Sequence, residues 1–326
     1  MLTKNHLEKA LIIGMYFLLL TPLFFQQSLM HPLTTLKTVV FQIVVEIIVA
    51  LYVCLAVFYK EYRPRFTPIT MGLFILLVTI FLSAIFGVNF HRSFWSVPER
   101  MTGVFLWLHL GALFLMLTSL SRKINWVKYL SCSTIVSFLA ALFPVVQLIF
   151  PGVFFDQITS RLSGTIGNPI FLAVYLLFHV FIGLWLASHF FKKKNNLKAS
   201  LFAIVSGFNL VVILLTQTRG AFLGLFAGFI FLVCAFVYKS FLKGKKYLAI
   251  SILVALLSIP VFFVATRNTL SFWQAVPLIN RFVGADLGVG PRFFAWETSV
   301  KTFLEKPVFG WGWENFYYAF NSHYQP

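Results

Sequence analysis

Long apolar stretches alternate with short polar loops along most of this chain. About nine of these stretches approach the ~20 residues that a helix needs to cross the hydrocarbon core of a bilayer. They lie near 9–27, 36–59, 68–87, 102–121, 129–150, 168–191, 199–216, 220–238 and 246–265. None has the alternation of apolar and polar residues that is typical of barrel strands, so the pattern predicts an all-α, polytopic transmembrane helical bundle.

The residues after the last apolar stretch follow a different pattern. Between two prolines, at 292–306, apolar residues recur at the three- and four-residue spacing of one helix face. The pattern predicts an amphipathic helix that lies on the membrane surface and is anchored by Trp296. We therefore divide the chain into a transmembrane helical domain, 1–265, and an external loop, 266–326.

The polar loops form two alternating sets that differ in the kind of positive charge they carry. One set, formed by the amino terminus and the loops near 60–67, 122–128, 192–198 and 239–246, contains 13 Lys and 3 Arg, and the opposite set contains 7 Arg and 2 Lys. Positively charged residues are retained on the cytoplasmic side during insertion, so the lysine-rich set is predicted to be cytoplasmic. The amino terminus then lies inside, and 266–326 lies outside the cytoplasmic (inner) membrane.

Composition narrows the function classes further. Hydrophobic residues make up 60% of the chain and charged residues 11%, which excludes an ordinary soluble globule. The formal net charge of +17 comes mostly from the lysine-rich loops, so topology explains it and no nucleic acid partner is implied. The cysteines are isolated, and the external carboxylates are scattered without a pair for a divalent ion. We predict the lipid bilayer as a partner, no metal and no cofactor.

The arginine-rich outer face points to an anionic substrate, because guanidinium groups grip phosphate in bidentate fashion. Arg219 is the most informative of these residues, since it is the single charged residue between Ser200 and Tyr238. It lies on a tight turn between two apolar stretches, where an unpaired charge is costly. Its partner is either Glu46 or a bound phosphate; alternatively, the side chain reaches water at the interface.

Three further arginines join Arg219 as candidate phosphate contacts. Arg292 begins the predicted surface helix, and Arg100 precedes the fourth apolar stretch. Arg161 opens a glycine-containing loop that leads into the sixth stretch, where backbone N–H groups at a helix start favour anions. An ordinary loop entering a helix is the alternative for that segment. Arg267 and Arg281 are predicted to be solvated.

Three motifs, and their order along the chain, resemble the O-antigen ligase/polymerase superfamily. The family signature Ser/Thr-Arg-Gly-Ala is matched by Thr218–Ala221, and a Gly-Asn-Pro helix start is matched by Gly167–Pro169. The closing pattern Pro-x-x-Gly-x-Gly-x-x-Asn-Phe is matched by Pro307–Phe316. The resemblance covers about 98–320, which is most of the chain.

The resemblance implies a glycan-transferring enzyme. Its members move a glycan from an undecaprenyl-pyrophosphate carrier to an acceptor hydroxyl on a glycolipid, glycan or protein outside the membrane, and the arginines would stabilise the pyrophosphate. The family also presents a His-Asn pair after the closing motif. Here His323 comes too early and is followed by Tyr324, so it is predicted to be an ordinary loop residue. We therefore expect a fragment that ends before the catalytic pair, and the catalytic residues stay unassigned.

Other functions remain open on the sequence alone. A repeat-unit polysaccharide polymerase of the same superfamily would use the same donor and a different acceptor. A transporter or flippase would use polar groups inside the membrane, for which the candidates are Glu46, His109 and His179. A membrane scaffold without catalytic activity is the third alternative. The identities of the donor glycan and the acceptor are not predicted.

Overall fold

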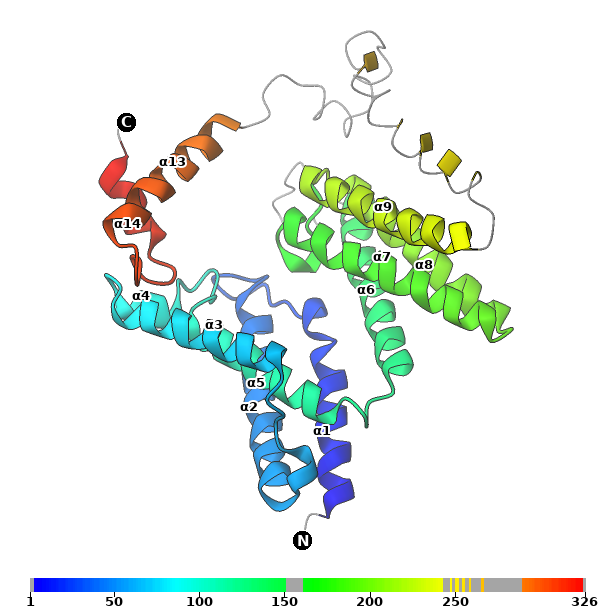
Figure 1. Ribbon diagram of the computed structural model, residues 1–326, viewed down its shortest axis with the longest axis horizontal. Coiled ribbons are helices and arrows are strands. Elements are labelled where there is room, and N and C mark those ends of the chain that lie inside the picture. Colours follow the sequence, from blue (N-terminus) through cyan, green and yellow to red (C-terminus); the bar gives the residue numbers. More distant parts are fainter. Residues whose placement is uncertain are drawn as a thin grey trace. The chain divides into compact units, whose positions relative to one another are not determined.

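A computed structural model describes residues 3–150, 161–242 and 289–324, together with isolated positions between 247 and 266. All regular structure in these ranges is helical, which confirms the all-α prediction (Figure 1). The helices are α1 (Lys4–Leu18), α2 (Thr35–Phe58), α3 (Pro68–Ile85), α4 (Phe90–Trp95), α5 (Val104–Leu120), α6 (Trp126–Ile149), α7 (Pro169–Lys192), α8 (Asn196–Leu215), α9 (Arg219–Leu242), α13 (Val289–Glu305) and α14 (Phe316–His323). Three short 3₁₀ helices are η1 (Thr21–Leu23), η2 (Lys60–Tyr62) and η3 (Gly164–Ile166).

Seven of the described helical segments are long and apolar enough to cross a membrane. An eighth apolar helix, α5, has 17 residues and spans about 25 Å at the usual rise per residue. The polytopic architecture is therefore confirmed, while the exact number of spans stays a prediction. The predicted span at 246–265 falls largely outside the described residues. The first helix ends at Leu18, earlier than predicted, because the chain tightens into η1 around Pro22.

The chain divides into two compact units, which are described separately. The first unit comprises Met1–Val136 and Gly288–Pro326, and the second comprises Ser137–Leu287. The first unit thus joins the amino-terminal helices to the segment that contains α13 and α14. The predicted boundary between a membrane domain and an external loop, at 265, lies at the edge of undescribed residues and stays a prediction.

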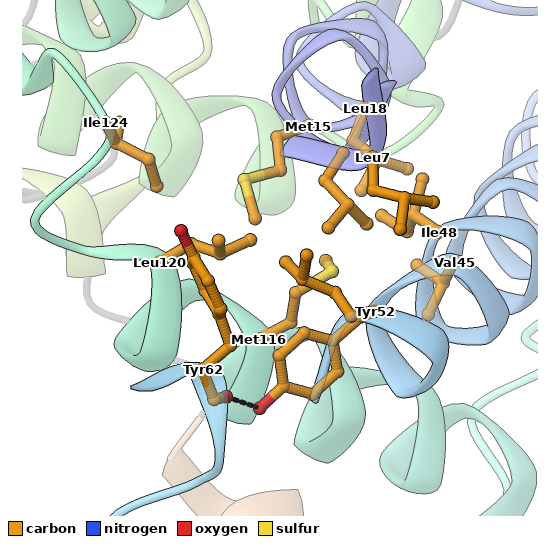
Figure 2. Packing of buried hydrophobic residues seen from close by; sticks show 12 residues of the cluster. Leu7, Met15, Leu18, Val45, Ile48, Tyr52, Tyr62, Met116, Leu120 and Ile124 are labelled. Atoms are coloured by element: carbon orange, nitrogen blue, oxygen red, sulfur yellow. Dashed lines mark hydrogen bonds between the residues drawn. The ribbon is translucent and has the colours of Figure 1, made fainter. Parts of the chain in front are cut away.

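The core of the first unit lies between α1, α2 and α5. Leu11 and Met15 are buried on one face of α1, because residues four apart lie one above the other on a helix. They pack in one cluster with Leu55 of α2 and Met116 of α5 (Figure 2). At the lysine-rich end of this core, the Tyr52 hydroxyl donates a hydrogen bond to the Tyr62 carbonyl oxygen at 2.9 Å. This contact fixes η2 against α2.

The second unit is built around α7, which packs against both α8 and α9 (Figure 1). Its buried cluster includes Leu176 of α7, Ile213 of α8 and Leu225 of α9. Small residues let these helices approach closely: a Cβ on Gly183 would lie 2.2 Å from the Ser206 hydroxyl oxygen. This packing places the carboxyl end of α8 and the amino ends of α7 and α9 at the same end of the unit.

Candidate functional site

The turn that carries Arg219 is held rigidly in the second unit. It joins the end of α8 at Leu215 to the start of α9 at Arg219, and Gln217 adopts a positive φ of 52° to complete it. The side chains of Thr216 and Thr218 point into the protein and are buried. The Thr216 hydroxyl donates to the Ile213 carbonyl oxygen at 2.7 Å, so the turn closes on its own backbone.

Arg161, which is distant in sequence, donates two hydrogen bonds to this same turn. Its Nε donates to the Thr216 carbonyl oxygen at 3.1 Å, and one terminal nitrogen donates to the Thr218 hydroxyl at 2.8 Å. Arg219 follows directly as the first residue of α9 and is half-buried. The structure therefore places Arg161, one of the four predicted arginines, against the turn that immediately precedes Arg219, a second one.

The start of α7 reaches the same place. The Asn168 side chain caps this helix by accepting from the Ile170 amide at 2.8 Å, which explains the Gly-Asn-Pro motif as a helix start. The Thr218 hydroxyl also lies 3.4 Å from the Pro169 carbonyl oxygen, which links the beginning of α7 to the beginning of α9. The Arg161 guanidinium thus lies beside the first residues of α7 and α9, and the positive end of a helix favours an anion.

The closing motif forms a docking segment in the first unit. Its Trp311 carbonyl oxygen accepts from the Val88 amide at 2.9 Å, just after α3. Asn315 is fully buried, and its side-chain nitrogen lies within hydrogen-bonding distance of the Asn89 carbonyl oxygen and the Ser93 hydroxyl. The glycine and asparagine positions of the motif therefore hold the α13–α14 segment on the corner between α3 and α4.

A hollow of about 680 Å³ opens beside this docking segment. Most of the side chains that line it are charged or aromatic: Arg92, Val97, Glu99, Arg100, Trp313, Glu314, Phe316, Tyr317 and Phe320. The Arg92 guanidinium lies 5.2 Å from the centre of the Tyr317 ring, and its Nε donates to the Glu314 backbone carbonyl at 3.1 Å. Arg100 therefore faces a hollow that contains a second guanidinium.

Glu314 is the organising carboxylate of this hollow. It accepts from the Thr102 hydroxyl at 2.9 Å and from the Ser96 hydroxyl at 3.3 Å. Glu314, Ser96 and Met101 have φ values of 61°, 66° and 52°, in the left-handed region that side-chain-bearing residues rarely adopt. Strained backbone of this kind clusters at functional sites, and here it surrounds one carboxylate.

Sequence reasoning missed Arg92 and Glu314 as members of this hollow. Arg92 lies on α4, a helix of six residues that is too short to produce a periodic pattern. The local signal for this helix in the sequence is its N-cap, Asn89, whose side chain accepts from the Arg92 amide at 3.0 Å. Glu314 lies within the closing motif, at a position that the family pattern leaves open, so the motif does not point to a pocket there.

The predicted surface helix is present as α13. It begins at Val289, earlier than predicted, because Pro291 is tolerated in the first turn of a helix. Its apolar side chains point outward, as shown by Trp296, which is 63% exposed. Thr298 and Thr302 are buried on the opposite side. Arg292, the remaining predicted phosphate contact, is exposed on the first turns of the helix.

The polar residues inside the predicted spans form local hydrogen bonds. His109 Nδ1 lies 2.7 Å from the Phe105 carbonyl oxygen, and its Nε2 lies 3.2 Å from Glu46 Oε1. His179 Nδ1 likewise lies 2.8 Å from the Tyr175 carbonyl oxygen. Glu46 is therefore paired with a histidine of its own unit.

His323 has a structural place. It ends α14 instead of lying in a loop, and its Nε2 is 2.9 Å from Glu305 Oε1 at the end of α13. Among the described residues, no three potential ligands of the His, Cys, Asp or Glu type come together. The expectation of a metal-free protein stays a prediction.

The fold defines a multi-pass helical membrane protein whose charged groups gather at helix ends. Residues 201–326 match the family model described as O-antigen ligase, and both the Arg219 turn and the closing motif lie inside the match. The match supports the superfamily predicted from the motifs, the O-antigen ligase/polymerase superfamily, whose members are glycosyltransferase- or ligase-type enzymes. The same comparisons found no matching curated protein and no matching solved structure.

Proposed function

We propose that this protein transfers a glycan from an undecaprenyl-pyrophosphate carrier to an acceptor hydroxyl at the outer face of the cytoplasmic membrane. The observation that carries the proposal is the arrangement around the turn before α9. There Arg219 begins a helix, Arg161 binds the preceding turn, and the start of α7 adjoins it. The family match includes this turn. Such a site suits the diphosphate of a lipid carrier.

The reaction needs charge stabilisation more than it needs a metal. The acceptor oxygen bonds to the anomeric carbon, the bond from that carbon to the pyrophosphate oxygen breaks, and a base takes the hydroxyl proton. Negative charge grows on the departing pyrophosphate. Arg219 would stabilise this charge, and Arg161 would hold the turn in position while adding its own positive charge. Preorganised arginines can supply this stabilisation without a divalent ion.

The hollow beside Glu314 suits a carbohydrate. Aromatic rings such as Tyr317 offer flat faces to the C–H surfaces of a sugar, while Glu99 and Glu314 offer acceptors for its hydroxyl groups. Arg100 and Arg92 add donors for acidic or phosphorylated sugars. We assign to this hollow a sugar of the donor or the acceptor, and to the exposed Arg292 a supporting contact with phosphate.

An in vitro transfer assay tests the function. Membranes containing the protein, a lipid-linked glycan and a hydroxyl acceptor should yield glycosylated acceptor and free undecaprenyl pyrophosphate in equal amounts, also in the presence of a metal chelator. Transfer to a different acceptor molecule indicates a ligase, and growth of repeats on the carrier indicates a polymerase. Movement of the intact lipid-linked glycan across the membrane without cleavage would refute the proposal in favour of a transporter.

The outward-facing apolar side of α13 suits the surface of the bilayer. A nitroxide label at Val300, on that side, should be relaxed mainly by oxygen, which concentrates in lipid. A label at the neighbouring Lys301, which pairs with Glu297 at 2.7 Å, is the matched control and should be relaxed mainly by a water-soluble reagent. Electron paramagnetic resonance in a background without the native cysteines measures both. Equal behaviour of the two labels would argue against a membrane-lying helix.

A further inference from the structure

A second hollow, of about 420 Å³, lies at the other end of the first unit. It is lined by η2, the loop from η2 to α3, the start of α3, the second half of α5 and the turn after α5. Its basic and hydroxyl lining includes Arg63, Arg65, Arg122, Lys123, Thr67 and Ser119. The proposed glycan chemistry does not use this hollow.

The acidic groups nearby are already paired, which leaves the hollow positive. Glu61 is bound by Lys4, whose hydrogen bond holds the pKa of this carboxyl below its usual range. Glu8 accepts from the Tyr62 hydroxyl and lies 3.6 Å from Lys123 Nζ. Among the described residues, no carboxylate lies within ion-pair distance of Arg65 or Arg122. Two guanidinium groups at the hollow are therefore available to an anion.

An exposed apolar surface continues directly from the basic hollow. Phe66 is 90% exposed, and Ile69, which also lines the hollow, is 71% exposed. Phe74, further along α3, faces outward as well. A free phosphate ion would use the basic part alone, whereas a phospholipid would place its headgroup in the hollow and an acyl chain along α3. The continuity of the two surfaces therefore favours a lipid.

This hollow is separate from the one that we assign to a sugar. The basic hollow is lined by Phe114 and Ser119, in the second half of α5, and by Arg122, just beyond its carboxyl end. Glu99 and Arg100, which precede the amino end of α5, line the other. The 17 residues of α5, which span about 25 Å, run from the one toward the other. The two hollows therefore belong to opposite ends of the helix, and the basic hollow lies on the lysine-rich side.

We infer that the basic hollow binds the phosphate headgroup of an anionic phospholipid in the leaflet on the lysine-rich side, with an acyl chain along the outer face of α3. Guanidinium groups recognise a phosphodiester in bidentate fashion, and basic pockets between helices on the cytoplasmic side are suited to anionic headgroups. The inference does not depend on the proposed glycan transfer, since it uses residues at the other end of α5.

Native mass spectrometry of the purified full chain with added phosphatidylglycerol or phosphatidylcholine tests this inference. The wild type should retain phosphatidylglycerol preferentially. The double variant Arg65→Gln/Arg122→Gln should weaken that retention about tenfold, because each basic group near an anionic headgroup contributes measurably. The matched control is Lys192→Gln/Lys193→Gln, which removes the same charge from the lysine-rich loop after α7 and should leave retention nearly unchanged.

Each other outcome counts against the inference. Equal loss in both double variants would show that general surface charge attracts the lipid. Equal retention of phosphatidylcholine by the wild type would show that the headgroup charge is not recognised, and this result needs no variant. Release of the lipid by excess inorganic phosphate would identify a free phosphate site.

The variant Ile69→Gln, which keeps all charges, should weaken lipid retention without changing the response to phosphate.

Discussion

Replacing Arg219 by lysine is expected to reduce glycan transfer by about 10²–10³-fold while the protein still inserts into the membrane. The substitution keeps the positive charge but removes the planar group that can hold two phosphate oxygens at once. The loss should fall on the chemical step, because charge on the pyrophosphate is largest in the transition state. Cells whose own copy carries the variant should show normal amounts of protein and little transferred glycan at the surface.

Two companion variants make this result specific to the site. Arg267→Lys is the matched control, since the sequence predicts a solvated arginine there, and it should transfer glycan at the normal rate. Arg161→Gln should also lose transfer, and it should lower the melting temperature because the bonds to Thr216 and Thr218 are removed. Normal transfer by Arg219→Lys would remove this arginine from the proposed site, whatever the effect of Arg161→Gln.

Replacing Gly87 by alanine is expected to detach the closing motif from the corner between α3 and α4. A Cβ at this position would lie 2.5 Å from the Gly312 Cα and 2.9 Å from the Trp311 carbonyl oxygen. Both contacts are backbone atoms that cannot rotate away, so the two segments must separate at a cost of about 3 kcal/mol. Protease cleavage within the segment that follows α13 should accelerate, and the melting temperature should fall.

Gly72→Ala is the matched control, because it adds the same methyl group to α3 where no atom lies within 4 Å. Helix propensity should make that change neutral or slightly stabilising. Gly312→Ala should repeat the effect of Gly87→Ala from the other side of the contact, with added strain from its φ of +102°. A Gly87→Ala protein with unchanged protease resistance would mean that the two segments are not held together by this backbone contact.

The hydrophobic pattern was sufficient to locate most helices closely. The stretches predicted at 36–59 and 168–191 correspond to α2 at Thr35–Phe58 and α7 at Pro169–Lys192. A single run of apolar residues this long crosses a bilayer as an α-helix, because every backbone polar group must be satisfied within the same segment. The stretch at 102–121 is shortened to Val104–Leu120, because Gly103, the N-cap of α5, has extended backbone.

The site itself needed the tertiary structure. Four arginines were predicted from charge and motif order. The sequence does not show that Arg161 donates to Thr218, which lies 57 residues later in the chain, in the turn before Arg219. Nor does it show that Glu314 accepts from Thr102, 212 residues away, in a hollow shared with Arg92.

The sequence by itself determined the class of protein, the positions of most of the long helices and the motif order that leads to the superfamily. These features follow from local composition, since each apolar run and each turn is set by its own residues. Only the tertiary structure decided which arginines share a turn, which carboxylate organises a hollow, and why the closing motif contains glycines. Such contacts join residues that are distant along the chain, so they depend on how the helices pack and leave no periodic trace in the sequence.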